Sequence, residues 1–406
     1  MKKSRKHFLG CILLALGVVS DGSLSGADSV PTLHQPTMTL AGASAKIFSL
    51  GVSADGRRVM ALAQDNTVRE WSLEDGKLLM TTEVRSLNLP EYDDLHGVWL
   101  TMGVVETRDE KYIVLGGGNC PVQVRDRITG NLIKEVVPHK TDCFVSDDGS
   151  RMALGLRGPV GSVTCISMPE CALVSTIPQW PQNSYQPVAS FSTTGDAVLL
   201  TNPGARSVTL YDTVTGHAAK TFTIIHGLTC AVLSGDKRHI ASEADFGFNA
   251  LALGGIRTEL YVTLTDTATG DEKGVEINGY YDGLPPAMAF SPDGKRLAVA
   301  SAHDVMIMDV ATMQATRRFM NEEGMPAELV ARIGLLDEIR DAPPPRTDPR
   351  LKDPVFLMEL NSAERHARDY FTNRRPMALT FTPDGKRLLV AVGEEIQVWS
   401  CADNAT

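Results

Sequence analysis

The sequence lacks the short motifs that mark common catalytic and metal sites. It contains no Cys-x-x-Cys-His, no His-Glu-x-x-His and no Gly-x-Ser-x-Gly, which excludes the usual haem attachment, zinc protease and nucleophile-elbow signatures. The glycine run Gly116–Gly118 is followed by a strand-like segment, whereas a phosphate-binding loop requires a helix. We therefore predict no catalytic residue, no metal site and no bound cofactor.

The chain is also poor in positive charge and in aromatic residues. Its 406 residues include 39 lysines and arginines against 49 acidic residues, a net charge of −10, and aromatic residues make up 6%. Such a charge disfavours binding to nucleic acid phosphates. Hydrophobic residues at 43% and charged residues at 22% are typical of a globular protein. We expect a folded, acidic protein that does not bind nucleic acid.

Residues 1–27 have the pattern of a secretory signal peptide. Four basic residues precede an apolar run from Phe8 to Val19, which is too short to cross a bilayer comfortably. The small residues Ser25-Gly26-Ala27 favour cleavage after them. Cleavage near Ser20 and a retained membrane anchor are the alternatives. We expect an exported protein, periplasmic or extracellular, without a stable membrane span after cleavage.

Export would permit disulfide bonds among the six cysteines that follow the signal segment. Cys165 and Cys171 flank the turn Ser167-Met168-Pro169-Glu170, so a hairpin would place them on neighbouring strands, and we predict them as a possible disulfide. The alternative is that all six are small buried side chains. The six are Cys120, Cys143, Cys165, Cys171, Cys230 and Cys401.

One phrase recurs seven times along the rest of the chain. It consists of an apolar run, a turn of the form Ser-x-Asp-Gly, a basic residue and a second apolar run. The aspartate bonds back to the backbone and the glycine supplies a positive φ, so each phrase predicts a β-hairpin. Three copies are strong and four are degraded. They lie at Val52–Arg58, Glu106–Lys111, Val145–Arg151, Phe191–Asp196, Leu233–Arg238, Phe290–Arg296 and Phe381–Arg387.

Each hairpin is followed by two further strand-like segments. A third strand such as Val305–Asp309 leads to a second turn, and a fourth strand such as Ala315–Met320 completes the unit. Seven units of four strands would expose many strand edges and apolar faces unless they closed into a ring. The pattern therefore predicts an all-β, seven-bladed β-propeller, monomeric, with its domain at residues 37–401.

The chain resembles the WD40-repeat β-propellers. Residues 39–43 and 47–56 follow that family's Leu-x-Gly-His and Ser-Pro-Asp-Gly elements at its spacing, and Asp65 and Trp71 match its turn aspartate and third-strand tryptophan. The resemblance covers about residues 37–320 and 376–400. The sequence departs from the family where Ala43 replaces the histidine and where only Trp71 and Trp399 occupy the tryptophan position. We therefore expect apolar packing, rather than that family's buried polar network, to hold the blades together.

The two ends of the repeat region complement each other. The seventh unit stops at Trp399-Ser400-Cys401 without a fourth strand, and Thr37–Leu40 precede the first unit without a partner. We expect the N-terminal strand to complete the last blade and close the ring.

Residues 321–375 interrupt the repeat between blades 6 and 7. Apolar residues at helical spacing predict two helices separated by a proline-rich link. Such a helical insertion either covers the central channel, presents an apolar groove to a partner, or packs on the side of the ring for stability. The residues that would form the partner site are Leu329, Ile333, Leu336, Phe356, Leu360, Tyr370 and Phe371.

Two classes of function fit this organisation. The resemblance implies a non-catalytic platform that binds another protein. The alternative is a propeller enzyme or cofactor carrier, similar to lactonases or quinoprotein dehydrogenases, with a site at the mouth of the central channel. Acids or histidines that converge at the channel mouth would favour chemistry, whereas an exposed apolar patch would favour a partner.

Overall fold

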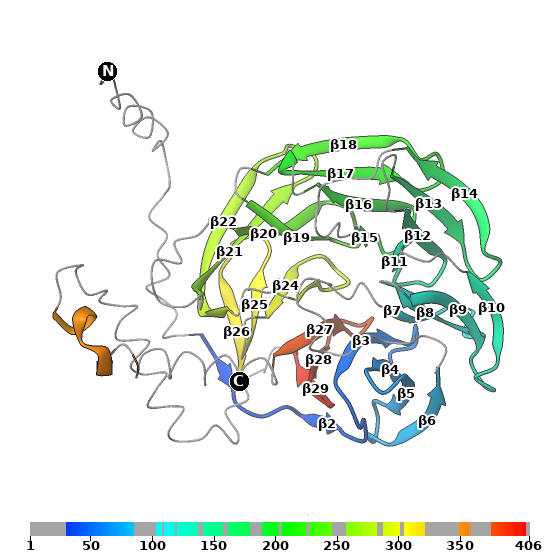
Figure 1. The fold of residues 1–406 in the computed structure, drawn as a ribbon, viewed down its shortest axis with the longest axis horizontal. Helices are drawn as coiled ribbons and strands as arrows, with labels where there is room; N and C mark the ends of the chain where they lie inside the picture. The colour runs from blue at the N-terminus through cyan, green and yellow to red at the C-terminus, as the bar shows by residue number, and fades with distance from the viewer. Residues whose placement is uncertain are drawn as a thin grey trace.

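The computed structural model shows seven small β-sheets that follow one another around a ring (Figure 1). It describes residues 30–84, 103–107, 109–117, 120–136, 141–156, 161–178, 189–202, 205–224, 227–245, 257–281, 287–300, 304–320, 349–356, 358 and 375–402. The prediction of an all-β, seven-bladed propeller is confirmed. In each blade the first strand lies toward the centre of the ring and the last lies on its outer edge (Figure 1).

The blades follow the order of the repeats. Blades 1 to 3 are β3 (Ile47–Val52), β4 (Arg58–Ala63), β5 (Thr67–Ser72) and β6 (Leu78–Glu83); β7 (Gly103–Glu106), β8 (Tyr112–Gly117), β9 (Cys120–Asp126) and β10 (Leu132–Val136); and β11 (Thr141–Val145), β12 (Arg151–Leu156), β13 (Ser162–Ser167) and β14 (Ala172–Ile177). Blades 4 and 5 are β15 (Ala189–Phe191), β16 (Ala197–Asn202), β17 (Ser207–Asp212) and β18 (Ala218–Thr223); and β19 (Gly227–Leu233), β20 (His239–Asp245), β21 (Arg257–Asp266) and β22 (Glu272–Tyr281). Blades 6 and 7 contain β23 (Met288–Phe290), β24 (Arg296–Ala300), β25 (Asp304–Asp309) and β26 (Ala315–Met320); and β27 (Pro376–Phe381), β28 (Arg387–Val392) and β29 (Glu395–Ser400).

The N-terminal strand closes the ring, as the sequence predicts. β2 (Met38–Leu40) pairs antiparallel with β29, with Met38 opposite Val398 and Leu40 opposite Ile396. It is thus the outer strand of blade 7. Leu40 is fully buried in an apolar cluster shared by blades 7 and 1. Two parts of the chain that are far apart in sequence therefore form one blade.

A second N-terminal strand was not expected. β1 (Thr32–Leu33) pairs in parallel with β26, with Thr32 opposite Arg318 and Leu33 opposite Phe319. It makes blade 6 a five-stranded sheet. The segment before β2 is thus attached to the outer edge of the neighbouring blade.

Seven apolar clusters hold the ring together, one between each pair of adjacent blades. Successive side chains of a strand point to opposite neighbours, so the second strand of most blades carries apolar residues on both faces. In β4, for example, Val59 and Ala61 pack toward blade 7, whereas Met60 and Leu62 pack toward blade 2. Between blades 6 and 7, the rings of Phe319 and Trp399 stack at 4.9 Å. Apolar packing thus joins each pair of adjacent blades, as the sequence predicts, but buried ion pairs also join blades 1 and 2.

The repeated phrase forms the same backbone turn in all seven blades. In six blades its hydroxyl bonds a carboxylate two residues on, whereas in blade 4 Ser192 bonds Asp196, four residues on. In blade 1, Ser53 Oγ donates to Asp55 at 2.6 Å and accepts a bond from Arg58 N at 3.0 Å. The two copies without glycine at this place keep the turn because Glu110 and Lys237 adopt the positive φ that glycine takes elsewhere. The hydroxyl–carboxylate pairs are Ser53–Asp55, Thr107–Asp109, Ser146–Asp148, Ser192–Asp196, Ser234–Asp236, Ser291–Asp293 and Thr382–Asp384.

These turns predict a loss of stability in acid. Burial alone would raise the pKa of Asp196, but hydrogen bonds from Lys237, Ser192 and Thr194 lower it to about 2. Between that value and the ordinary 3.8, the unfolded chain binds more protons than the native one, so the free energy of unfolding falls as the pH is lowered through this range. Melting temperatures measured from pH 7 to pH 2.5 should stay level down to about pH 5 and then fall.

An Asp196→Asn variant tests the origin of this acid sensitivity. Its melting temperature should depend less on pH below about 4 than that of the unchanged protein, because one carboxylate with a lowered pKa is gone. An identical pH profile for the two proteins would show that this turn does not contribute.

The predicted helical insertion lies mostly outside the described residues. The described part contains a 3-10 helix at Pro349–Lys352 and a half-buried Phe356, whose ring centre lies 5.6 Å from the Arg350 guanidinium. The other predicted partner-site residues, Leu329, Ile333, Leu336, Leu360, Tyr370 and Phe371, fall outside it, as do residues 1–27. The insertion therefore stays a prediction. Within the described ranges, no helix is long and apolar enough to cross a membrane.

Candidate functional site

The inner strands around the centre of the ring approach each other closely. A Cβ atom on Gly51 of β3 would lie 2.3 Å from the carbonyl oxygen of Val104 in β7, so only glycine fits there. Ser49 Oγ also accepts a bond from Val104 N at 3.2 Å. Between blades 4 and 5, Ser190 Oγ accepts from Leu233 N at 3.0 Å.

In the part of the chain that the structure describes, no three His, Cys, Asp or Glu side chains form a group able to hold a metal ion.

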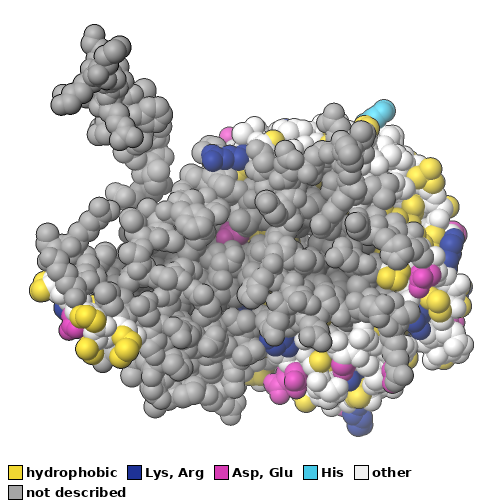
Figure 2. Space-filling view, in the orientation of Figure 1, with side chains coloured by type: hydrophobic (Ala, Val, Ile, Leu, Met, Phe, Trp, Pro, Cys, Tyr) yellow, Lys and Arg dark blue, Asp and Glu magenta, His cyan; other side chains and the backbone are white. Residues whose placement is uncertain are grey.

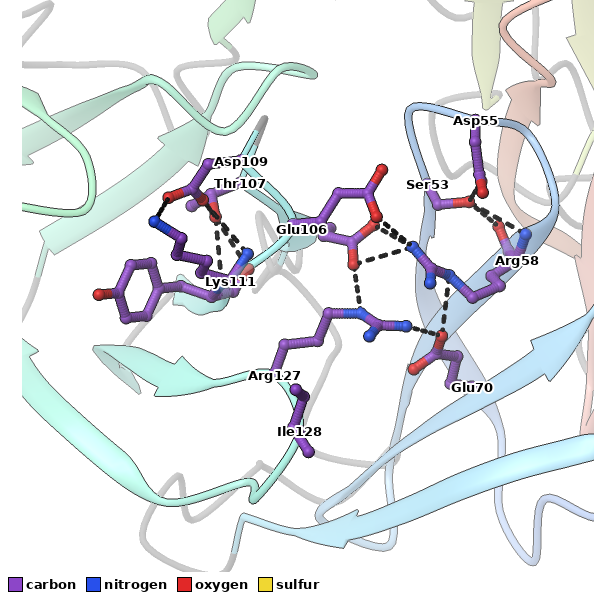
Figure 3. Close-up of polar contacts among 12 residues, drawn as sticks. Ser53, Asp55, Arg58, Glu70, Glu106, Thr107, Asp109, Lys111, Arg127 and Ile128 are labelled. Carbon is purple, nitrogen blue, oxygen red and sulfur yellow. Dashed lines mark hydrogen bonds and ion pairs between the residues drawn. The ribbon is translucent and has the colours of Figure 1, made fainter.

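Blades 1 and 2 enclose a cluster of buried charges (Figure 3). Glu70 of β5 lies 3.1 Å from Arg58 Nε and 2.7 Å from Arg127 Nη2. Glu106, at the end of β7, contacts both the Arg127 guanidinium and Arg58 Nη2, the latter at 3.2 Å. The two carboxylates are only 4% and 3% exposed. Glu110, which is partly exposed, lies 3.3 Å from Arg58 at the edge of the cluster.

Each buried carboxylate in this cluster faces two guanidinium groups. Burial raises the pKa of Glu106, an effect that Arg58 and Arg127 oppose. Burial alone would lower the pKa of Arg58, but the carboxylates of Glu106 and Glu70 outweigh this effect and raise the pKa above its ordinary value. Arg58 and Glu70 come from blade 1, whereas Glu106 and Arg127 come from blade 2. The cluster therefore joins the two blades by charge-assisted hydrogen bonds.

A second polar network lies within blade 1, around the residues that match the WD40 pattern. Asp65 accepts hydrogen bonds from Ser44 Oγ at 2.6 Å and from Arg69 Nη2 at 2.7 Å. Burial alone would raise the pKa of Asp65, but these hydrogen bonds and those from Thr67 lower it to about 2. Trp71 Nε1 donates to Ala41 O at 2.9 Å. Ser44 and Arg69 thus supply the donors where Ala43 cannot.

The basic residue of the repeated phrase connects neighbouring blades near the hairpin turns that the phrase forms. Arg296 donates to Gly385 O at 2.7 Å and to Cys401 O at 3.0 Å, from blade 6 to blade 7. Arg387 donates to Leu73 O at 2.7 Å and to Gly56 O at 2.9 Å, from blade 7 to blade 1. Sequence reasoning noted this basic residue but assigned it no role.

A similar set of contacts runs along the outer strands. In four blades of the described chain a side chain of the outer strand donates to a carbonyl oxygen in the next blade, near the turn that precedes that blade's own outer strand, and Arg317 of β26 donates to Ser400 at the end of β29. These contacts are Lys134 to Glu170 at 2.8 Å, Ser175 to Thr213 at 2.6 Å, Lys220 to Thr267 at 2.7 Å, Lys273 to Ala311 at 3.2 Å and Arg317 to Ser400 at 3.1 Å. Neighbouring blades are therefore connected at two places: near the turn between the first and second strands, and near the turn between the third and fourth strands.

Large apolar side chains are exposed on the outer edge of blades 1, 2 and 3. Ile128 is 82% exposed, Leu132 47%, Ile133 57% and Leu173 68%. We call this set, together with the exposed Leu78 and Leu79 of β6, the apolar rim. Figure 2 shows hydrophobic side chains at the right-hand edge of the molecule, where Figure 1 places β10 and β14. The corresponding outer strands of blades 5 and 6 begin with Glu272-Lys273 and Ala315-Thr316.

The predicted disulfide between Cys165 and Cys171 is not formed, and both are free thiols. The β13–β14 register places Ser175 opposite Cys165, and Cys171 lies in the turn before β14 with a positive φ. The register thus keeps the two thiols from facing each other across the hairpin. Burial raises the pKa of Cys165, and that of the buried Cys401 to about 11, so these thiols are unreactive near neutral pH.

The comparison with solved structures identifies the fold. A chain from Kuenenia stuttgartiensis described as hydrazine synthase is similar to this chain with a TM-score of 0.58 and 20% sequence identity. The similarity covers 91% of this chain and 98% of that one. At this identity the likeness concerns the fold alone. No protein-family model matches the chain, and no curated protein sequence matches it significantly.

Proposed function

We propose that this chain is an exported propeller of the WD40 type that acts as a non-catalytic platform and binds another protein through its apolar rim. The apolar rim carries the proposal. It places large apolar side chains in water on three consecutive blades, at positions where blades 5 and 6 have Glu272-Lys273 and Ala315-Thr316. Exposed apolar patches of this kind mark interaction surfaces on soluble proteins.

The polar architecture supports the same function. The buried carboxylates Glu70 and Glu106 each lie against two arginines, and the contacts of Glu70 with Arg127 and of Glu106 with Arg58 join blades 1 and 2. The WD40 type is supported by the seven Ser/Thr–Asp turns and by the Asp65 and Trp71 contacts in blade 1. The alternative is a propeller enzyme or cofactor carrier with a site at the channel mouth. Its support is that the similar solved chain is described as a hydrazine synthase.

Co-purification from the exported fraction of the native host tests the platform. A stoichiometric companion should accompany the tagged protein and fall at least tenfold when Leu132 and Ile133 are both changed to Lys, because burying a charge against an apolar partner is unfavourable. The matched control is Thr316→Lys, which places a lysine at the corresponding position of blade 6 and should leave the companion bound.

Other outcomes point away from the apolar rim. A companion that survives the double lysine variant but is lost on deletion of residues 321–375 would move the site to the insertion. A protein that comes out alone with a bound small molecule would favour the enzyme or cofactor carrier. N-terminal sequencing of the exported protein should show that residues 1–27 have been removed.

A further inference from the structure

The outer edge of one blade is already occupied by an added strand. β1 lies in parallel against β26, and Arg318 N donates to Pro31 O at 3.0 Å. Leu33 of β1 packs against the apolar cluster between blades 6 and 7. An outer strand of this propeller therefore accepts a fifth strand through backbone hydrogen bonds, with an apolar side chain alongside.

The outer strand of blade 2 has the same edge geometry as β26. In β26 the register skips one residue, with Ala315 opposite Met308 and Arg317 opposite Ile307. In β10 it skips one residue at the same place, with Leu132 opposite Arg125 and Lys134 opposite Val124. Ile133 of β10 thus corresponds to Thr316 of β26, and Glu135 corresponds to Arg318. By this correspondence the Glu135 N–H points to the outer edge, as that of Arg318 does.

The two edges differ in what covers them. The first four residues of β10 are all exposed, including the apolar-rim residues Leu132 and Ile133. At the corresponding positions of β26, which carries β1, Thr316 is exposed but Ala315, Arg317 and Arg318 are half-buried. An exposed apolar edge strand is an unfavourable feature that proteins normally cover or charge. In the described part of the chain no fifth strand covers the edge of β10.

We propose that β10 is the acceptor edge for an extended strand of the partner protein, which adds as a fifth strand of blade 2. The partner segment is an extended chain with an apolar side chain, like Pro31-Thr32-Leu33 of β1. Backbone hydrogen bonds, including one from Glu135 N–H, supply affinity, and Leu132 and Ile133 supply the apolar contact. This inference rests on the proposed function, because it specifies how a partner binds the apolar rim.

A peptide with the sequence of residues 30–36 is the probe, since the chain itself uses this segment for strand addition. It is titrated to millimolar concentration against the full mature chain and three variants. Glu135→Pro removes the edge N–H, and proline is tolerated on an edge strand. Glu135→Ala is the matched control, because it also loses the bond from Gln123 Nε2 but keeps the N–H. Ile133→Lys reports on the apolar contact.

Strand addition predicts that the unchanged protein and Glu135→Ala bind the peptide and that Glu135→Pro binds at least tenfold more weakly. Amide exchange in residues 132–136 of the unchanged protein should slow at least tenfold at saturation. This second measurement decides the matter if Glu135→Pro fails to fold. Equal binding by the two Glu135 variants, unchanged amide exchange, or no binding at millimolar peptide would each overturn the inference. The proposed function is tested separately by co-purification of the native companion. If Ile133→Lys loses the companion but Glu135→Pro keeps it, the protein binds a partner through the apolar rim without strand addition.

Discussion

A chain that begins at residue 41 should be far less stable than one that begins at residue 34. The shorter chain lacks β2, so β29 loses its outer partner and the ring loses the pairs Met38–Val398 and Leu40–Ile396. Truncating one fully buried leucine to alanine already costs about 2–5 kcal/mol. Removing the whole strand also uncovers a long strand edge. We expect a lower melting temperature and a tendency to aggregate, measured by calorimetry and light scattering.

The chain that begins at residue 34 is the control for this truncation. It lacks only β1, which adds a fifth strand to a blade that already has four. Its melting temperature should lie close to that of the chain that begins at residue 28. If the chain that begins at residue 41 melts at the same temperature as the one that begins at residue 34, ring closure by β2 contributes nothing to stability.

Replacing Glu70 with alanine should destabilise the protein by about 3–5 kcal/mol, because one partner of a buried ion pair is removed and the other remains. Glu70 contacts Arg58 and Arg127, which both stay in place between blades 1 and 2. With Glu106 as the one remaining buried carboxylate of the cluster in Figure 3, two guanidinium groups would share it. Urea denaturation followed by fluorescence measures the free energy of unfolding.

Glu110→Ala is the matched control, because it removes a carboxylate from the same cluster at an exposed position. An exposed ion pair contributes at most about 1 kcal/mol, so this variant should be nearly as stable as the unchanged protein. If the two variants lose similar free energies of unfolding, then burial of the carboxylate does not determine how much the cluster stabilises the protein.

The hairpin turns could be predicted even from degraded copies of the repeat. The segment Glu106–Lys111 has no glycine, yet Thr107 Oγ1 still donates to Asp109 at 2.7 Å. The bonds that define the turn join residues at most five positions apart, so a short stretch of sequence contains all of them. The same locality explains why the disulfide prediction failed: the turn was right, but the register across it depends on where each strand begins.

The contacts between blades could not be predicted in the same way. Arg58 meets Glu106 across 48 positions of sequence, and Arg387 meets Gly56 across 331. The sequence shows the arginines as a repeated basic residue, but nothing in it says which carbonyl or carboxylate the next blade presents. The apolar rim was missed for a related reason, since Leu132 and Ile133 look like ordinary strand residues until the fold leaves them without a covering layer.

The repeats alone are enough to specify a closed ring of seven β-sheets. Each sheet is specified by hairpin turns whose bonds lie within a few residues, and the unpaired first and last strands require each other to cover their edges. The identity of the charges that are buried together, and of the apolar side chains that stay exposed, follows from the folded arrangement of the blades. Both depend on the surface that a neighbouring blade places opposite a side chain, and that surface comes from a distant part of the chain.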